Sequence, residues 1–252
     1  MYNNNKVMNK LNYLLTIVFI VFSGIFFACS EKDGTEPETT QGSAPAFQGK
    51  SIEVPQEMVQ SSNPGAQESM SYIAIANSFT GYTGMFVPPQ KSGNYKSTNE
   101  GSPWVYSWEV NDQSGSFTVT LTVNENDYET TWAIVLNGEM DGIPLVDFTY
   151  LYGEESQDGK SGMIRLYDPE SNSLGFETSW ATENNVDTFR FYVPEELEIM
   201  VNQYPDNSGS LNAKEWTNGQ LVLSFSAIWT ASGSGEAWEY YENGSMINHE
   251  TW

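Results

Sequence analysis

From Trp104 onward, hydrophobic and polar residues alternate over many short stretches of the chain. Alternation with a period of two is typical of β-strands with one buried face, because successive side chains point to opposite sides of a sheet. The pattern predicts strands with apolar faces over residues 104–110, 117–123, 128–134, 146–152, 174–180, 189–193, 197–201 and 221–229, and a terminal strand with aromatic residues on both faces around Trp238.

Turn-forming residues separate these strands. They are Asn137-Gly138, Asp168-Pro169, Asn184-Asn185, Pro205-Asp206-Asn207, Asn218-Gly219 and Asn243-Gly244. Asn-Gly favours a tight hairpin because both residues tolerate positive φ. Short connections between successive strands predict an all-β, up-and-down antiparallel meander of about ten to twelve strands. Closing such a sheet removes its two open edges, so we expect a closed or nearly closed barrel, with a two-layer β-sandwich as the alternative.

One segment ahead of the strands has helical spacing instead. Apolar residues recur near a period of 3.6 at Ala66, Met70 and Ile73, and Asn63-Pro64 supplies a cap and a proline for the first turn. Gly81 is the first residue expected to stop the helix. Because apolar residues occur on both sides of this helix, we expect it to be packed against the sheet.

The strands also contain an internal repeat. A Ser-Gly dipeptide is followed by a strand, a turn and a second strand that ends in tryptophan. The four pairs are Gly115 with Trp132, Gly162 with Trp180, Gly209 with Trp229 and Gly235 with Trp252. The first three glycines are 47 residues apart. We interpret each copy as a hairpin that a glycine opens and a tryptophan closes.

The first 28 residues have the organisation of an export signal. Lys6 and Lys10 precede an apolar run over residues 14–28, which is short for a bilayer span and of the length of a signal-peptide core. The run ends in Ala28 directly before Cys29, the one cysteine of the chain. Phe26-Phe27-Ala28-Cys29 resembles a bacterial lipobox, although leucine is usual at the position of Phe26. The resemblance implies cleavage before Cys29 and lipidation of its thiol.

The residues after Cys29 extend this resemblance. Ser30-Glu31-Lys32-Asp33 resembles the acidic export signal of Bacteroidota surface lipoproteins. It implies an outer-membrane lipoprotein that faces outward. Residues 29–50 are rich in Pro, Gly, Thr and Glu and are expected to form a flexible tether. Residues 51–252 are then expected to form a single β-rich domain.

Composition excludes several classes of function. The 252 residues include 33 Asp and Glu but 10 Lys and Arg, and the net charge is −23, which argues against nucleic-acid binding. One cysteine and one histidine exclude cysteine-based zinc sites and multi-histidine metal centres. The sequence has neither a dinucleotide-binding fingerprint nor a phosphate-binding loop, and we expect no cofactor and no metal.

The surplus of aromatic residues, 14% of the chain, is the compositional sign of a ligand. Most tryptophans share a face with Val, Leu and Ile and are expected in the core; Trp216 and Trp238 are the candidates for exposed, ligand-binding rings. We therefore expect a non-catalytic surface protein that binds a small apolar ligand or a glycan. One alternative is a structural or accessory subunit of an envelope complex, with a protein partner.

A second alternative is an envelope hydrolase that uses paired carboxylates. Its sequence support is weak, because Glu154-Glu155 and Glu195-Glu196 are adjacent, and neighbours on a strand point to opposite faces. A catalytic triad is also disfavoured, since His249 lies three residues from the end of the chain.

Overall fold

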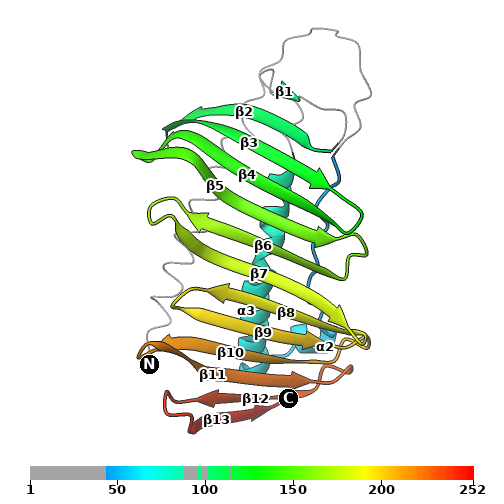
Figure 1. Cartoon of the computed structure of the whole chain (residues 1–252). Coiled ribbons are helices and arrows are strands. Elements are labelled where there is room, and N and C mark those ends of the chain that lie inside the picture. Colours follow the sequence, from blue (N-terminus) through cyan, green and yellow to red (C-terminus); the bar gives the residue numbers. More distant parts are fainter. Residues whose placement is uncertain (1–43, 88–95, 98–101, 114) are drawn as a thin grey trace. The chain divides into compact units, whose positions relative to one another are not determined.

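The computed structural model describes residues 44–87, 96–97, 102–113 and 115–252 (Figure 1). The helices are α2 (Gln56–Val59), α3 (Pro64–Asn77) and the 3-10 helix η1 (Ser78–Phe86). The strands are β1 (Lys96–Ser97), β2 (Trp104–Asp112), β3 (Gly115–Glu125), β4 (Glu129–Met140), β5 (Ile143–Ser156), β6 (Ser161–Asp168), β7 (Ser173–Glu183), β8 (Val186–Val193), β9 (Leu197–Gln203), β10 (Gly209–Thr217), β11 (Gln220–Trp229), β12 (Gly235–Tyr240) and β13 (Met246–Thr251).

The strands follow one another in a single sheet in chain order, from β1 to β13. This confirms the all-β antiparallel meander, with thirteen described strands rather than ten to twelve. The expected barrel is not seen in the described residues, where the strand order is linear and β1 and β13 are the two edges. The described strands also form no second sheet, which the alternative β-sandwich would need. Short connections build a meander whether or not its ends meet, so the sequence pattern did not distinguish an open sheet from a closed one.

The edge formed by β13 is covered by side chains. Gly235 and Trp252 exchange two backbone hydrogen bonds of 3.0 Å, so the alternation of an antiparallel pair points the backbone N–H of His249 away from β12. That N–H donates to Oδ1 of Asn248 at 2.9 Å, and the carbonyl of Thr251 accepts from Nδ2 of Asn63 at 3.1 Å. Both contacts occupy groups that would otherwise be available to pair with another strand.

The chain forms two compact units. The first comprises the described residues of Met1–Ala46, Met85–Tyr152 and Tyr167–Ser173. Its core is formed by alternate residues of β2, β3 and β4, as the period-two pattern predicts. The hydroxyl of Tyr106 accepts from the backbone N–H of Ala44 at 3.3 Å, and Nε1 of Trp132 donates to the carbonyl of Pro45 at 3.0 Å. Ala44 and Pro45, which were expected to belong to a flexible tether, therefore lie against the sheet.

The second unit comprises Phe47–Gly84, Gly153–Leu166 and Leu174–Trp252. Helix α3 packs on one face of its sheet, against β8, β9, β11, β12 and β13 (Figure 1). The ring of Tyr72 lies 5.2 Å from that of Phe225, and the ring of Phe79 stacks on Trp180 at 6.0 Å. The helix approaches so closely that a Cβ atom on Gly65 would lie 2.8 Å from Cβ of Glu250. The expected packing of the helix against the sheet is confirmed.

The helix begins where the sequence predicts it. Oδ1 of Asn63 accepts hydrogen bonds from the backbone N–H groups of Gly65 and Ala66, at 2.8 and 3.4 Å, and Pro64 occupies the first helical position. The α-helix ends at Asn77, earlier than the expected stop at Gly81, and the chain continues as the 3-10 helix η1.

Three of the four predicted hairpins, β6–β7, β10–β11 and β12–β13, run from their glycine to their tryptophan, and in these three the two residues also come into contact. A Cβ atom on Gly162, Gly209 or Gly235 would lie 2.2, 2.4 and 2.5 Å from Cζ2 of Trp180, Trp229 and Trp252, respectively. Each indole therefore lies over its glycine from the neighbouring segment and covers backbone that has no side chain of its own. The fourth pair does not form, because Gly115 pairs with Met140 at one end of the β3–β4 hairpin while Trp132 pairs with Val123 near the other.

Five of the six predicted turns connect strands, and one prediction was wrong. Asn137-Gly138 lies inside β4, and the β4–β5 turn is at Asp141-Gly142 instead, with φ of 51° and 80°. Gly138 is needed for close approach rather than for a turn, since its Cβ atom would lie 2.4 Å from the carbonyl oxygen of Ser116. The side chain of Asn137 hydrogen-bonds with Asp147 of β5.

A small acidic cluster lies between α3 and the sheet and leads to a prediction on stability. Burial and the nearby charges of Glu239 and Glu215 raise the pKa of Glu68 above 4.5. A carboxyl whose pKa is raised by folding stabilises the fold below its unfolded pKa and loses that contribution as the pH rises. Glu68→Gln is therefore expected to raise the melting temperature at pH 7 by about 1–2 °C, since like-charge contacts cost a few tenths of a kcal/mol. This gain in melting temperature should disappear near pH 4.

Thermal unfolding followed by circular dichroism at both pH values measures this effect. Glu57→Gln is the matched control, because it removes the same charge from an exposed position of α2. Equal shifts for the two variants at pH 7 would contradict the role of the cluster.

Candidate functional site

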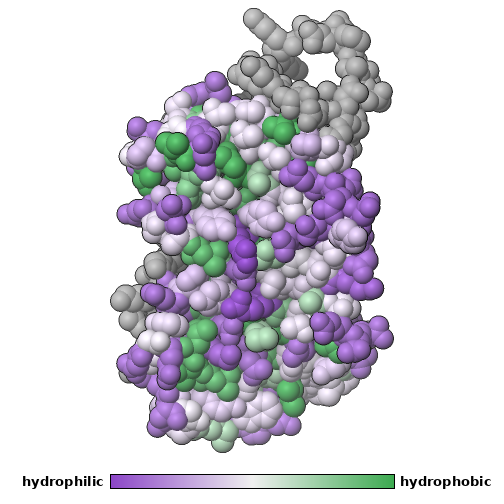
Figure 2. Space-filling view, viewed as in Figure 1, coloured by the Kyte–Doolittle hydropathy of each residue, from purple (hydrophilic) through white to green (hydrophobic). Residues whose placement is uncertain are grey.

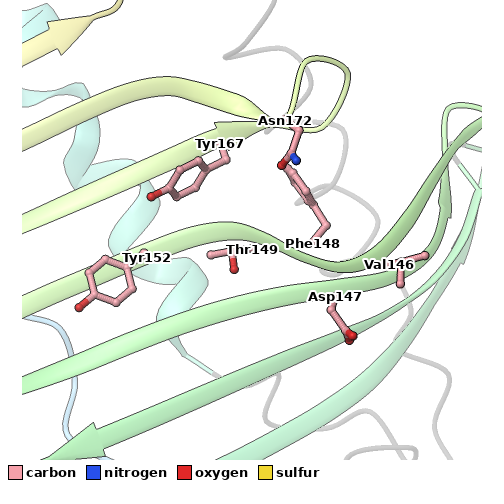
Figure 3. Close-up of a pocket in the computed structure, with 7 residues that line it drawn as sticks. All are labelled: Val146, Asp147, Phe148, Thr149, Tyr152, Tyr167 and Asn172. Atoms are coloured by element: carbon pink, nitrogen blue, oxygen red, sulfur yellow. The ribbon is translucent and has the colours of Figure 1, made fainter.

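A groove of about 430 Å³ is present in the first unit, between β5, β6 and the turn that follows β6. Figure 3 shows the lining side chains. They are Val146, Asp147, Phe148, Thr149, Tyr152, Tyr167 and Asn172. The set combines three aromatic rings with an amide, a hydroxyl and one carboxylate.

The groove follows from a break in the alternation of β5. Asp147 has φ of 46°, a left-handed conformation that aspartate tolerates better than most residues. Val146 is 81% exposed, although the sequence pattern placed it on the buried face with Phe148. Asn137 of β4 holds the irregular residue: its Oδ1 accepts from the backbone N–H of Asp147 at 2.8 Å, and its Nδ2 donates to Oδ1 of Asp147 at 3.1 Å.

The groove has two chemically different ends (Figure 3). Tyr152 of β5 and Tyr167 of β6 lie at one end, and their side chains point in the same direction. Val146 and Asp147 lie at the other end, with Phe148 and Asn172 between the two ends. Sequence analysis missed this site, because the segment Val146-Asp147-Phe148 fits regular alternation and carries no local sign of a bulge.

Trp216, one of the two predicted ligand-binding residues, lies in the second unit and is 39% exposed. A register shift in the β10–β11 pair aligns Lys214 with Leu223 and Trp216 with Leu221. Cross-strand partners share a face, so Leu221 and Leu223 lie beside Trp216 and not with the buried Phe225, as the sequence pattern predicted. Figure 2 shows hydrophobic residues gathered over the left ends of β10 and β11, on the face opposite α3.

Trp238, the second predicted residue, is half-buried and stacks on His249. The two rings are 5.2 Å apart and nearly parallel, at 3°. Nε2 of His249 lies 2.9 Å from Oε2 of Glu236. One neighbour therefore already contacts Trp238 on the side of β13. The structure does not bring Trp216 or Trp238 into the groove.

The face of the second unit's sheet opposite α3 also carries a chain of ion pairs across β6 to β10, where Figure 2 shows a run of hydrophilic residues. Glu177 contacts Arg165 at 2.7 Å and Arg190 at 2.9 Å, and Glu198 contacts Arg190 and Lys214, both at 2.9 Å. Burial raises the pKa of Glu198, but hydrogen bonds and charges from Lys214 and Arg190 outweigh burial and hold the pKa below 4.5. These cations are therefore engaged within the sheet.

Glu155 and His249, two residues considered for catalysis, both have partners in the described residues. The part of the chain that the structure describes holds no group of three or more His, Cys, Asp and Glu side chains placed to bind a metal ion. Glu155 is buried and accepts a hydrogen bond from the backbone N–H of Gln48 at 3.1 Å, so it serves the packing of the N-terminal segment. His249 has a carboxylate partner, Glu236, as the histidine of a catalytic triad would. A triad also needs a serine beside the histidine, but Ser226, in the same cross-strand row, is separated from His249 by Trp238.

The predicted lipidation site Cys29 and the predicted export signal Ser30, Glu31, Lys32 and Asp33 lie outside the described residues. Among the helices that the structure describes, none has the length and apolar character to cross a membrane. The sequence matches no protein-family model and no curated protein.

Proposed function

We propose that this chain is a lipid-anchored protein of the outer membrane, exposed at the cell surface, that binds a glycan and does not transform it. The groove between β5 and β6 carries the proposal for the ligand, and the sequence of residues 1–33 carries the proposal for the anchor and the location.

The groove has the chemistry that sugars need. The C–H face of a sugar ring packs on an aromatic ring, and its hydroxyl groups need hydrogen-bond partners at the rim. Tyr152 and Tyr167 supply the rings, and Asp147, Thr149 and Asn172 supply polar partners. The groove is open to solvent and polar over much of its length, which favours a glycan over the small apolar ligand, the other class that the aromatic surplus suggested.

Tyr167→Ala is expected to weaken glycan binding about fivefold, because loss of one aromatic contact costs about 1 kcal/mol. Isothermal titration of the purified full chain with neutral oligosaccharides of glucose, mannose, galactose and N-acetylglucosamine measures this loss. Tyr128→Ala is the matched control, since Tyr128 is 83% exposed in the same unit and does not line the groove. Binding of no oligosaccharide, neutral or charged, or equal losses in both variants, would contradict the proposal.

A second candidate function, an accessory subunit of an envelope complex, is favoured by one observation. Trp216, Leu221 and Leu223 form a partly exposed apolar surface on the second unit. A photocrosslinker placed at position 216 on intact cells tests for a protein partner, and recovery of the uncrosslinked chain alone would count against this function.

A further inference from the structure

The charge of the groove narrows the class of glycan. Asp147 is the one charged residue among those that line it, and no lysine or arginine is present there. The chain as a whole has a net charge of −23. A negative field of this kind repels anionic ligands and concentrates cationic ones.

The carboxylate of Asp147 is positioned rather than mobile. Its Oδ1 atom accepts from Nδ2 of Asn137 at 3.1 Å, and its own backbone N–H donates to Oδ1 of Asn137 at 2.8 Å. In the part of the chain that the structure describes, Oδ2 of Asp147 has no hydrogen-bond partner. Asn137 therefore presents a carboxylate with one unused oxygen at the end of the groove away from the tyrosines (Figure 3).

We infer that the groove prefers a glycan with a free amino group, which Asp147 binds as an ammonium ion while a sugar ring further along the same oligosaccharide packs on Tyr152 and Tyr167. This inference rests on the proposed glycan-binding function. An ammonium group donates hydrogen bonds to a carboxylate and gains the attraction of opposite charges, whereas an acetylated amine retains neither the charge nor two of the donors. A uronic acid at the same position would meet a like charge.

The test compares oligosaccharides of one length that differ in this group: chitosan oligomers with free amines, chitin oligomers with N-acetyl groups, and oligogalacturonate with carboxylates. Titration of the full chain at low salt is expected to show chitosan oligomers binding about two- to fivefold more tightly than chitin oligomers, the range for an exposed ion pair, and no binding of oligogalacturonate. Added salt should reduce the first preference.

Asp147→Asn isolates the local contact. Asparagine also tolerates the left-handed backbone and can still accept from Asn137, so the fold and the groove should persist. The variant is expected to lose most of the preference for chitosan oligomers and to keep only the part that comes from the charge of the whole chain, with the chitin affinity unchanged. Asp127→Asn is the matched control, because it removes the same charge from an exposed turn at the other end of β4 and should keep the preference.

The inference would be overturned by an unchanged preference in Asp147→Asn, by an equal loss in Asp127→Asn, or by binding of oligogalacturonate as tight as that of chitosan oligomers. Binding of chitin oligomers without any preference for the amine would overturn the amino-sugar inference but leave the glycan function intact. Failure of all three oligomers, together with the neutral panel, would remove both.

Discussion

Replacing Cys29 with serine is expected to abolish acylation of the chain. Serine lacks the thiol that carries the lipid, and the lipobox that directs cleavage before position 29 is lost with the cysteine, so the apolar run over residues 14–28 is expected to stay on the variant. Each buried methylene of an acyl chain contributes about 0.8 kcal/mol to membrane binding, so two or more chains hold the wild-type protein stably. The expected effect on the acyl mass is therefore all-or-none.

Intact mass spectrometry of the chain from its own membranes measures the acyl groups directly. Ser30→Ala is the matched control and should retain them. Substitution of alanine for all four residues Ser30, Glu31, Lys32 and Asp33 should keep the acyl mass but protect the chain from protease added to intact cells. A wild-type chain without acyl mass would remove the anchor and, with it, the proposed location.

Gly209→Ala is expected to destabilise the fold by about 2–3 kcal/mol, the upper part of the range for overpacking in a core. The new Cβ atom would lie 2.4 Å from Cζ2 of Trp229 and 2.6 Å from the carbonyl oxygen of Asn202. Trp229 has little freedom to move, because it is buried and its Nε1 donates to the carbonyl of Asn207 at 2.9 Å. For a domain of this size the loss corresponds to about 5–10 °C in melting temperature.

A double-mutant cycle with Trp229→Phe measures the contact itself. The smaller ring leaves room for the methyl group, so Gly209→Ala should cost markedly less in the Trp229→Phe background. Gly219→Ala is the contrasting variant: its Cβ atom would meet nothing within 4 Å, so its cost comes from the φ of 86°, whereas Gly209 has no left-handed φ and its cost comes from contacts. Additive effects of Gly209→Ala and Trp229→Phe would show that the glycine is not there to accommodate the indole.

Local sequence signals predicted local structure well where the interactions lie within a few residues. They failed where pairing with a neighbouring strand determined the conformation. Asn63-Pro64 forms the helix cap because the bonds it makes lie within three residues. Asn137-Gly138 carries a strong turn signal, yet the pairing of β4 with β3 continues through it and the turn forms at Asp141-Gly142. Two adjacent turn signals compete, and the register that pairs more of the hairpin prevails.

The candidate site was the least predictable part. A one-residue bulge reverses which side chains face the core, and nothing in the alternation at Asp147 or Ser224 marks one. The sequence therefore predicted Val146, Leu221 and Leu223 on the buried face, and the groove beside Val146 was not anticipated. Trp216 was a candidate for an exposed ring and is exposed in the structure, two residues before the Asn218-Gly219 turn.

The sequence by itself determined most of the strands, their order as a meander, the helix and three of the glycine-to-tryptophan hairpins, because periodicity, caps and short turns act between residues close along the chain. Only the tertiary structure decided that the described sheet stays open, which tryptophans are covered, and that Tyr152, Tyr167 and Asp147 share a groove. Those features depend on strand register and bulges, which are set by pairing between distant segments and by the packing that each register permits.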